Sequence, residues 1–128
     1  MSLDTLIAER LAAPFVWGAN DCALFAADAV KAQTGTDPAE SLRGTYSTQV
    51  GAARVIKRDG GLQNIAAKAL GEPLAGPLLA QAGDVGIVEQ NGADVLAVCH
   101  AGGWIAPGPQ GLCAMPIRAA RVAWRVAK

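Results

Sequence analysis

The pattern of apolar residues changes near Gly83, and this change limits the folds open to the chain. Before Gly83, apolar side chains recur at spacings of three and four residues, which is the periodicity of amphipathic helices. After Gly83, short apolar runs alternate with Gly, Pro and Asn, a pattern typical of strands joined by tight turns. Asn91-Gly92 is a strong hairpin signal. The sequence therefore predicts an α+β domain in which N-terminal helices pack on a C-terminal antiparallel sheet.

Local signals mark where the expected elements begin and end. Pro14 ends the first helix, and either Asn20 or Asp21 caps the second through a short side-chain oxygen. Gly35 closes the second helix as a left-handed cap, and Ser47 or Thr48 caps the third. We expect helices over about 3–13, 21–33, 49–58 and 62–70, and strands over about 84–88, 95–99, 104–106, 112–115 and 121–126.

Length and composition indicate one ordered domain over residues 1–128. The chain is 52% hydrophobic and 17% charged, which argues against disorder. With 11 basic and 11 acidic residues, it lacks the excess of positive charge that is typical of proteins that bind nucleic acid. Residues 3–13 are amphipathic and charged, which argues against a signal peptide, and no apolar run is long enough to span a bilayer.

The three cysteines do not indicate a disulfide framework or a metal site. Their number is odd and no C-x-x-C pair occurs. Cys99 and His100 are adjacent, so their side chains would leave a strand on opposite faces. We interpret Cys99 and Cys113 as core or strand residues and expect neither a metal nor a cofactor.

Cys22 is the candidate nucleophile because it falls in the first turn of the second expected helix. Free backbone N–H groups and the positive end of the helix dipole favour a thiolate at that position. Enzymes often place a nucleophilic cysteine there. The alternative is a cysteine that only fills the core beneath a capped helix.

The residues around Cys22 resemble a known family. Trp17-Gly18, followed after a short gap by Asp21-Cys22-Ala23-Leu24-Phe25, resembles the "W-G … D-C-S-G-F" segment of NlpC-like cysteine hydrolases. These are papain-like enzymes that cut cell-wall peptides, and their cysteine is the nucleophile. Here Ala23-Leu24 stands in place of Ser-Gly. The resemblance implies an NlpC-like papain fold with Cys22 at the catalytic position.

The whole chain also resembles uncharacterised phage and prophage proteins of about this length, which are usually grouped with the NlpC-like fold. The shared patterns are "W-G-x-N-D-C-x-L-F-x-A-D-A", "T-G-x-D-P", "R-G-x-Y", "G-G-L", "G-D-V" and a terminal "A-W-R-V". This resemblance implies synthesis in the bacterial cytoplasm without a signal peptide, followed by incorporation in a phage particle. The implied partners are other tail proteins and a peptidoglycan peptide.

A cysteine hydrolase needs a base beside its thiol, and His100 is the only histidine. In the family register the catalytic histidine falls at Val95, five positions earlier. Five residues span about 16 Å of strand and reverse the face on which a side chain lies. The position of the third catalytic residue falls near Ala106, which is apolar. A bulge or early strand end near residues 102–103 would turn His100 back toward Cys22. Alternatively, the register of the family pattern on this chain is shifted, and the catalytic position is not Val95.

Two functions therefore remain open. The first is a structural or binding module of a virion that keeps the fold without the catalytic histidine, and the spacing favours it. The second is an active hydrolase with a Cys22–His100 dyad. As ligand-contacting residues we expect Trp17, Asp21 and Trp104, the last because residues 104–111 have the composition of an exposed surface.

Two further side chains carry structural expectations. Tyr46 lies downstream of the nucleophile, whereas the tyrosine that helps build the oxyanion site in NlpC-like proteins lies upstream, so that role does not transfer. We expect Tyr46 to be a packed ring with a hydrogen-bonded hydroxyl. Arg43 is expected to pair with Asp28 or Asp37 on grounds of charge.

Overall fold

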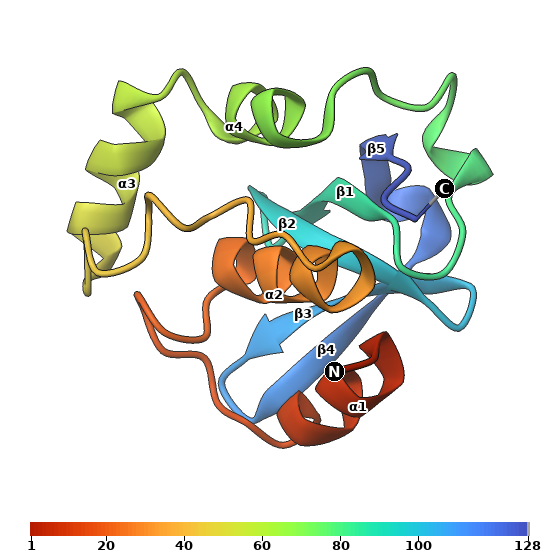
Figure 1. Ribbon diagram of the computed structural model, residues 1–128, viewed down its shortest axis with the longest axis horizontal. Helices are drawn as coiled ribbons and strands as arrows, with labels where there is room; N and C mark the ends of the chain where they lie inside the picture. The colour runs from red at the N-terminus through yellow and green to blue at the C-terminus, as the bar shows by residue number, and fades with distance from the viewer. Residues whose placement is uncertain (128) are drawn as a thin grey trace.

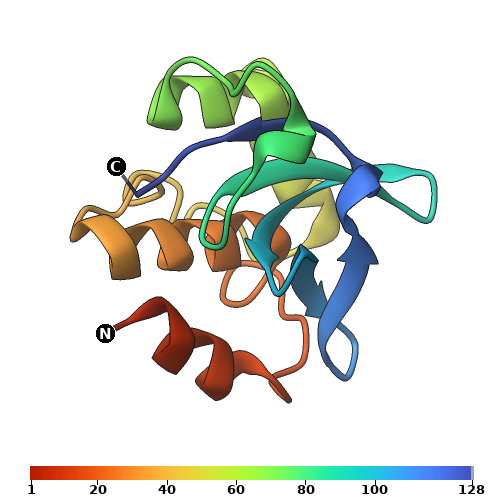
Figure 2. The same cartoon turned by 90° about the vertical axis from the view of Figure 1, so that its right-hand side faces the viewer.

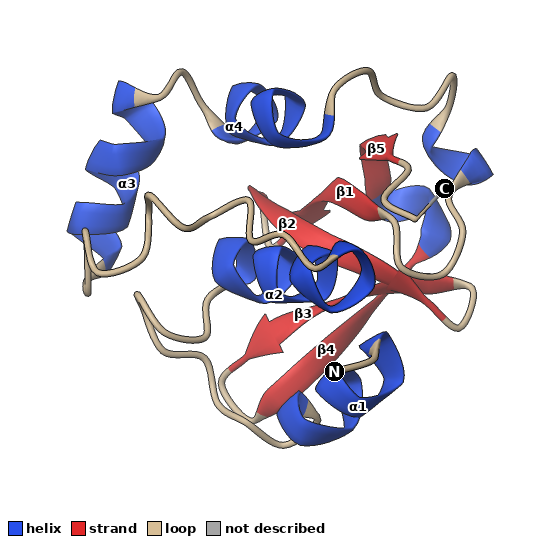
Figure 3. Ribbon diagram, in the orientation of Figure 1, coloured by secondary structure: helices blue, strands red, loops and turns tan. Residues whose placement is uncertain are grey.

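A computed structural model describes residues 1–127, and within that range four α-helices precede a five-stranded sheet (Figures 1 and 3). This order confirms the expected α+β class. The helices are α1 (Leu3–Arg10), α2 (Cys22–Thr34), α3 (Gln49–Arg58) and α4 (Leu62–Leu70). The strands are β1 (Val85–Gln90), β2 (Ala93–His100), β3 (Gly103–Gly108), β4 (Gly111–Pro116) and β5 (Ala120–Trp124). Two short 3-10 helices, η1 (Pro77–Leu79) and η2 (Ile117–Ala119), complete the described elements.

The sheet is antiparallel throughout its described pairings and has the strand order β4-β3-β2-β1-β5. Its centre is the β1–β2 hairpin, in which Val85 pairs with Val98 and Gln90 with Ala93. The predicted Asn91-Gly92 turn is present, and both residues have positive φ, 52° and 80°. Figure 2 shows the sheet curling away from the helices, which lie along one side of it.

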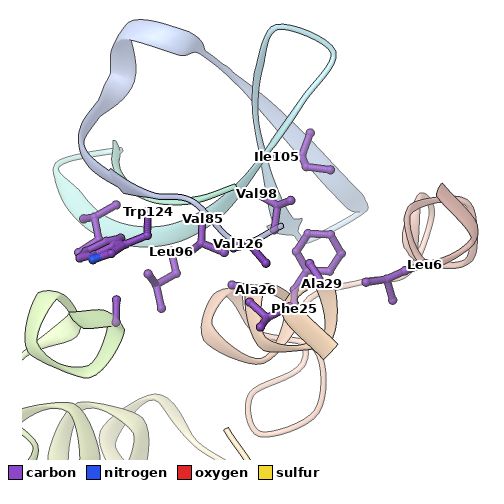
Figure 4. Close-up of a cluster of buried hydrophobic side chains, with 13 residues drawn as sticks. Leu6, Phe25, Ala26, Ala29, Val85, Leu96, Val98, Ile105, Trp124 and Val126 are labelled. Carbon is purple, nitrogen blue, oxygen red and sulfur yellow. The ribbon is translucent and has the colours of Figure 1, made fainter. Parts of the chain in front are cut away.

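The face of the sheet toward α2 carries the larger hydrophobic core. Side chains alternate along a strand, so Leu96 and Val98 of β2 face the same way as Val85 and Ile87 of β1. They meet Phe25, which is fully buried on α2, and α1 and α4 add residues at the margins of this cluster (Figure 4). This core fixes the position of α2 against the middle of the sheet.

The opposite face is also covered. Trp104 lies there over Gly86, where a Cβ atom would come within 2.6 Å of the indole ring. The indole N–H of Trp104 donates to the carbonyl of Ile117 in η2 at 2.9 Å. Trp104 is 0% exposed, so the expectation that it lies on an exposed surface, which was the ground for a contact with a ligand, is wrong. Two segments pack over this face: the chain that follows α4, through Leu74 and Ala80, and η2, through Ile117 and Ala119. Most of β3 is buried.

The expected helix caps are mostly confirmed. Asp21 is the N-cap of α2, and Gly35 ends that helix with φ of 83°. Thr48 caps α3. The exception is α1, which ends at Arg10 rather than near Pro14. The carbonyl of Leu11 accepts a bond from the amide of Leu112 in β4, so this carbonyl joins the chain to the sheet instead of extending the helix.

A buried carboxylate explains the Gly-Asp-Val pattern at the start of the sheet. Asp84 is 1% exposed and accepts bonds from the amides of Gln81 and Val126. The guanidinium of Arg125 donates to the same carboxylate at 2.9 Å. Asp84 therefore joins the start of β1 to the segment after β5. Within residues 1–127, no helix has both the length and the apolar character needed to cross a membrane.

Candidate functional site at the start of α2

The site that the sequence indicated is built by the loop between α1 and α2, which Figure 1 shows running from the bottom of the molecule to the first turn of α2. The amide of Phe15 donates to the carbonyl of Gly108 in β3 at 2.9 Å, which ties the loop to the sheet. Val16 and Asn20 form an isolated bridge. The loop is therefore tied to β3 through Phe15 and closed on itself between Val16 and Asn20.

Asp21 is the centre of this site. One carboxylate oxygen accepts the amide of Leu24 at 2.9 Å, which is the helix-capping bond. The other accepts the amide of Gly18 at 3.0 Å and the hydroxyl of Tyr46 at 2.7 Å. The side chain is 1% exposed and both of its oxygens are occupied. Asp21 therefore organises the loop and is not available to bind a substrate in this arrangement.

Tyr46 confirms one expectation and adds a contact that the sequence did not indicate. Its hydroxyl is hydrogen-bonded, as predicted, but the partner is Asp21, 25 residues earlier. Burial first, and then the bond to Asp21, raise the pKa of the Tyr46 hydroxyl. Tyr46 thus remains a neutral hydrogen-bond donor beside the first turn of α2. No local sequence signal joins a loop tyrosine to a helix cap so far away.

Cys22 occupies the first turn of α2, as predicted, and is half-buried. Burial raises the pKa of its thiol from 9.0 to about 11. The backbone of Leu96 in β2 opposes this rise, whereas the charge of Asp21 adds to it. The expectation of a thiolate is therefore wrong. The loss of hydration outweighs the favourable helix dipole, and the nearest carboxylate disfavours a second negative charge.

His100 does not lie beside Cys22. The thiol faces the backbone of Leu96, and His100 is four residues further along the same strand, about 13 Å at the usual rise of a strand. No bulge separates them, because β2 pairs in register with β1 as far as Val98 and with β3 from Val98 to His100. His100 is half-buried at the end of β2, opposite Gly103. Direct proton transfer needs a separation of about 3 Å, so this geometry does not form a dyad.

The other family positions for catalytic residues are apolar. Val95 packs into the cluster on the far face of the sheet, beside residues such as Ala97 and Trp104. Leu96, one position later, is on the face of β2 toward α2 and is the residue whose backbone lies beside the Cys22 thiol. Neither position holds a histidine, so shifting the family register by one residue does not supply a base. Ala106 is 1% exposed and also belongs to the far-face cluster.

Trp17 remains available for a ligand. It is half-buried, and its ring meets that of Phe15 edge to face with centroids 4.7 Å apart. Both rings line a shallow hollow together with Pro107 of β3 and Pro109 of the β3–β4 turn. Gln90 and Asn91 border the same hollow and no charged side chain does, among the residues that line it. The aromatic loop therefore presents a neutral surface near the start of α2.

A network of charges supports the site from the other side of α2. Arg43 pairs with both of its expected partners, Asp28 at 2.7 Å and Asp37 at 2.7 Å. Arg10 of α1 pairs with Asp28 at 2.6 Å and also donates to Asn20 at 2.9 Å. The hydrogen bond from Arg43 is the main cause that lowers the pKa of Asp37. These contacts connect α1, α2 and the segment that leads to Tyr46.

Comparison with known proteins gives a family but no function. A family model described as "Domain of unknown function (DUF6950)" matches residues 1–126. No curated protein matches the chain. No solved structure matches it either. In the part of the chain that the structure describes, no group of three or more histidine, cysteine, aspartate or glutamate side chains is arranged to hold a metal ion.

Proposed function

The chain belongs to the DUF6950 family, a domain of unknown function, and we propose that it is an NlpC-like module that has kept the architecture of a cysteine hydrolase without its activity. Two features support the NlpC-like assignment: the order of helices before an antiparallel sheet, and a cysteine in the first turn of a helix packed on that sheet. The sequence around Cys22 adds the resemblance to the "W-G … D-C" segment.

The observation that carries the proposal is the state of Cys22. A thiol with a pKa of about 11 is almost fully protonated at neutral pH. A nearby imidazole normally removes that proton in a cysteine hydrolase. Here the strand position that faces the thiol is Leu96, and the histidine lies about 13 Å further along β2. Neither Asp21 nor Tyr46 replaces the imidazole, since both are engaged with each other.

We place the module in a phage or prophage particle, in or near the tail, where it serves as a structural or binding component. The support for this placement is the sequence resemblance to phage and prophage proteins along the whole chain. Other tail proteins are the proposed partners, and a peptidoglycan peptide is the proposed ligand of the surface near Trp17. Synthesis takes place in the bacterial cytoplasm, and the particle carries the protein outward.

The alternative is an active hydrolase that cuts a cell-wall peptide or amide bond. The position of Cys22 favours it, because the first turn of a helix supplies free N–H groups that stabilise an oxyanion. In this mechanism the thiolate attacks the carbonyl carbon, the amine leaves with a proton from the imidazolium, and water hydrolyses the acyl-enzyme. His100 would first have to move to the thiol.

Release of soluble fragments from purified peptidoglycan separates the two functions. We expect the unmodified protein to release no more than Cys22→Ala does. Release by the unmodified protein that is lost in both Cys22→Ala and His100→Ala would establish the hydrolase and overturn the proposal. Alkylation of Cys22 by iodoacetamide provides a second measure, which requires no knowledge of the substrate. We expect His100→Ala to alkylate at the unmodified rate, whereas a working dyad predicts a slower reaction.

A further inference from the structure

An apolar cavity of about 50 Å³ lies between α2, α4 and the segment 38–42. Every side chain that lines it is apolar, and nearly half of them are alanines. The alanines are Ala23, Ala26 and Ala27 of α2, Ala66 and Ala69 of α4, and Ala39 of the connecting segment. Their short side chains leave the space between the two helices unfilled. Such walls offer water no hydrogen-bond partner and favour an apolar group.

The cavity adjoins a wider hollow at the surface, of about 400 Å³. The cavity and the hollow share the side chains of Pro38, Leu42, Ile65 and Ala69 as walls. These four residues therefore form the boundary between an apolar interior and the exposed surface.

The hollow has an excess of positive charge. Arg58 and Lys68 border it together with a single acidic residue, Asp59, and with Ser41. Asp59 is already paired with Arg58 at 3.1 Å. Lys68 is exposed and takes part in no ion pair within residues 1–127. The charge of Lys68 helps to lower the pKa of Asp59, so an anion that enters the hollow shares Lys68 with that carboxylate.

We infer that this cavity and hollow together bind a small amphipathic carboxylate, with its aliphatic tail in the cavity and its carboxylate at Lys68. Engineered cavities of about 150 Å³ hold benzene, so about 50 Å³ takes the last two carbon atoms of a tail. The rest of the tail lies across Leu42 and Ile65 in the hollow. Two buried methylene groups strengthen binding by about tenfold, which makes this a site of modest affinity.

This inference does not depend on the proposed function. Cys22 does not line the cavity, and neither proton transfer nor nucleophilic attack is involved. A variant at Cys22 therefore has no expected effect on this site.

Nuclear magnetic resonance titration of the full chain with octanoate tests the inference, since chemical-shift changes measure weak binding at each residue. We expect saturable shifts at Ala66, Ala69 and Leu42. Octyltrimethylammonium has the same tail and the opposite charge, and we expect it to bind more weakly. Absence of saturable shifts at these residues with octanoate, or equal affinity for the two amphiphiles, would overturn the inference.

Variants test the two ends of the ligand separately. Lys68→Gln should raise the dissociation constant for octanoate about two- to fivefold, as expected for an exposed ion pair, and Lys57→Gln on α3 serves as the matched charge control.

Ala69→Leu places a larger side chain at the boundary and should raise the dissociation constant for octanoate by about tenfold. Ala53→Leu at an exposed position of α3 is its control. Because Ala69 is exposed, we expect this variant to fold, and its spectrum verifies that. Unchanged affinity in Ala69→Leu would contradict binding in the cavity.

Discussion

The Cys22 thiol should ionise at a higher pH than an ordinary cysteine thiol does. Its pKa is raised from 9.0 to about 11, so its thiolate fraction at pH 7.5 is about 100-fold lower than that of an ordinary cysteine. A more basic thiolate is also a better nucleophile, by about tenfold over this range. The net expectation is alkylation about tenfold slower than that of a free cysteine, with an inflection in the rate near pH 11.

The measurement is the rate of iodoacetamide modification between pH 6 and pH 11.5, read by mass spectrometry of the peptide that contains Cys22. Peptides that contain Cys99 and Cys113 are resolved in the same digest and do not interfere. Circular dichroism at each pH verifies that the protein stays folded. An inflection near or below pH 8 would refute the reasoning, because it would mean that the helix dipole outweighs burial at this position.

The same shift predicts a loss of stability at high pH. The folded-state pKa is above the unfolded value, so the contribution of the buried thiol is fully present below pH 9.0 and is lost as the pH rises toward about 11. The whole contribution is about 2–3 kcal/mol. We expect the difference in free energy of unfolding between the unmodified protein and Cys22→Ala to fall by about 2 kcal/mol between pH 8 and pH 10.5. Urea titrations at the two pH values measure this difference, and an unchanged difference would contradict it.

Three further predictions concern the residues around the site. Gly18→Ala should destabilise the protein by more than about 2 kcal/mol, because φ is 80° and the new Cβ would lie 2.3 Å from the carbonyl of Tyr46. The control is Gly44→Ala, with φ of 76° and open space around it, which should cost only about 1 kcal/mol in the same urea titration. Tyr46→Phe removes the bond to the buried carboxylate and should cost about 1.5 kcal/mol, and no measurable change in urea unfolding would show that water replaces the hydroxyl. Arg43→Ala should lower the free energy of unfolding by about 1 kcal/mol at pH 7. Because Arg43 lowers the pKa of Asp37, the stabilisation from this pair is present above pH 3.8 and is lost as the pH falls below it, so the cost of the substitution should shrink there. A cost that does not change with pH would contradict the pairing.

The elements of the fold could be predicted because their signals are local. Helical periodicity placed α2 to within one residue at each end, and Asp21 and Gly35 marked its caps. The Asn91-Gly92 turn fixed the central hairpin, since only a few residue types adopt positive φ at both positions. The end of α1 was predicted too far along the chain. Its last expected turn is replaced by a bond between Leu11 and Leu112, about one hundred residues apart, which no local pattern contains.

The site could be predicted only in part. The sequence placed Cys22 at the start of α2, but its protonation depends on how deeply β2 covers it. Trp104 was expected at the surface because residues 104–111 have the composition of an exposed surface, yet Gly86 of β1 leaves room for the indole to lie buried. Arg43 was assigned two possible partners from charge, and the structure gives it both.

By itself, the sequence determined which segments are helical and which extended, how α2 is capped, and which sulfur stands at its start, because those properties depend on neighbours a few residues away. Only the tertiary structure decided that Tyr46 meets Asp21, that the thiol of Cys22 faces Leu96, and that alanines on α2 and α4 line an apolar pocket. The physical reason is the same in each case. Hydration, charge and free space at a side chain are set by atoms that arrive from distant parts of the chain.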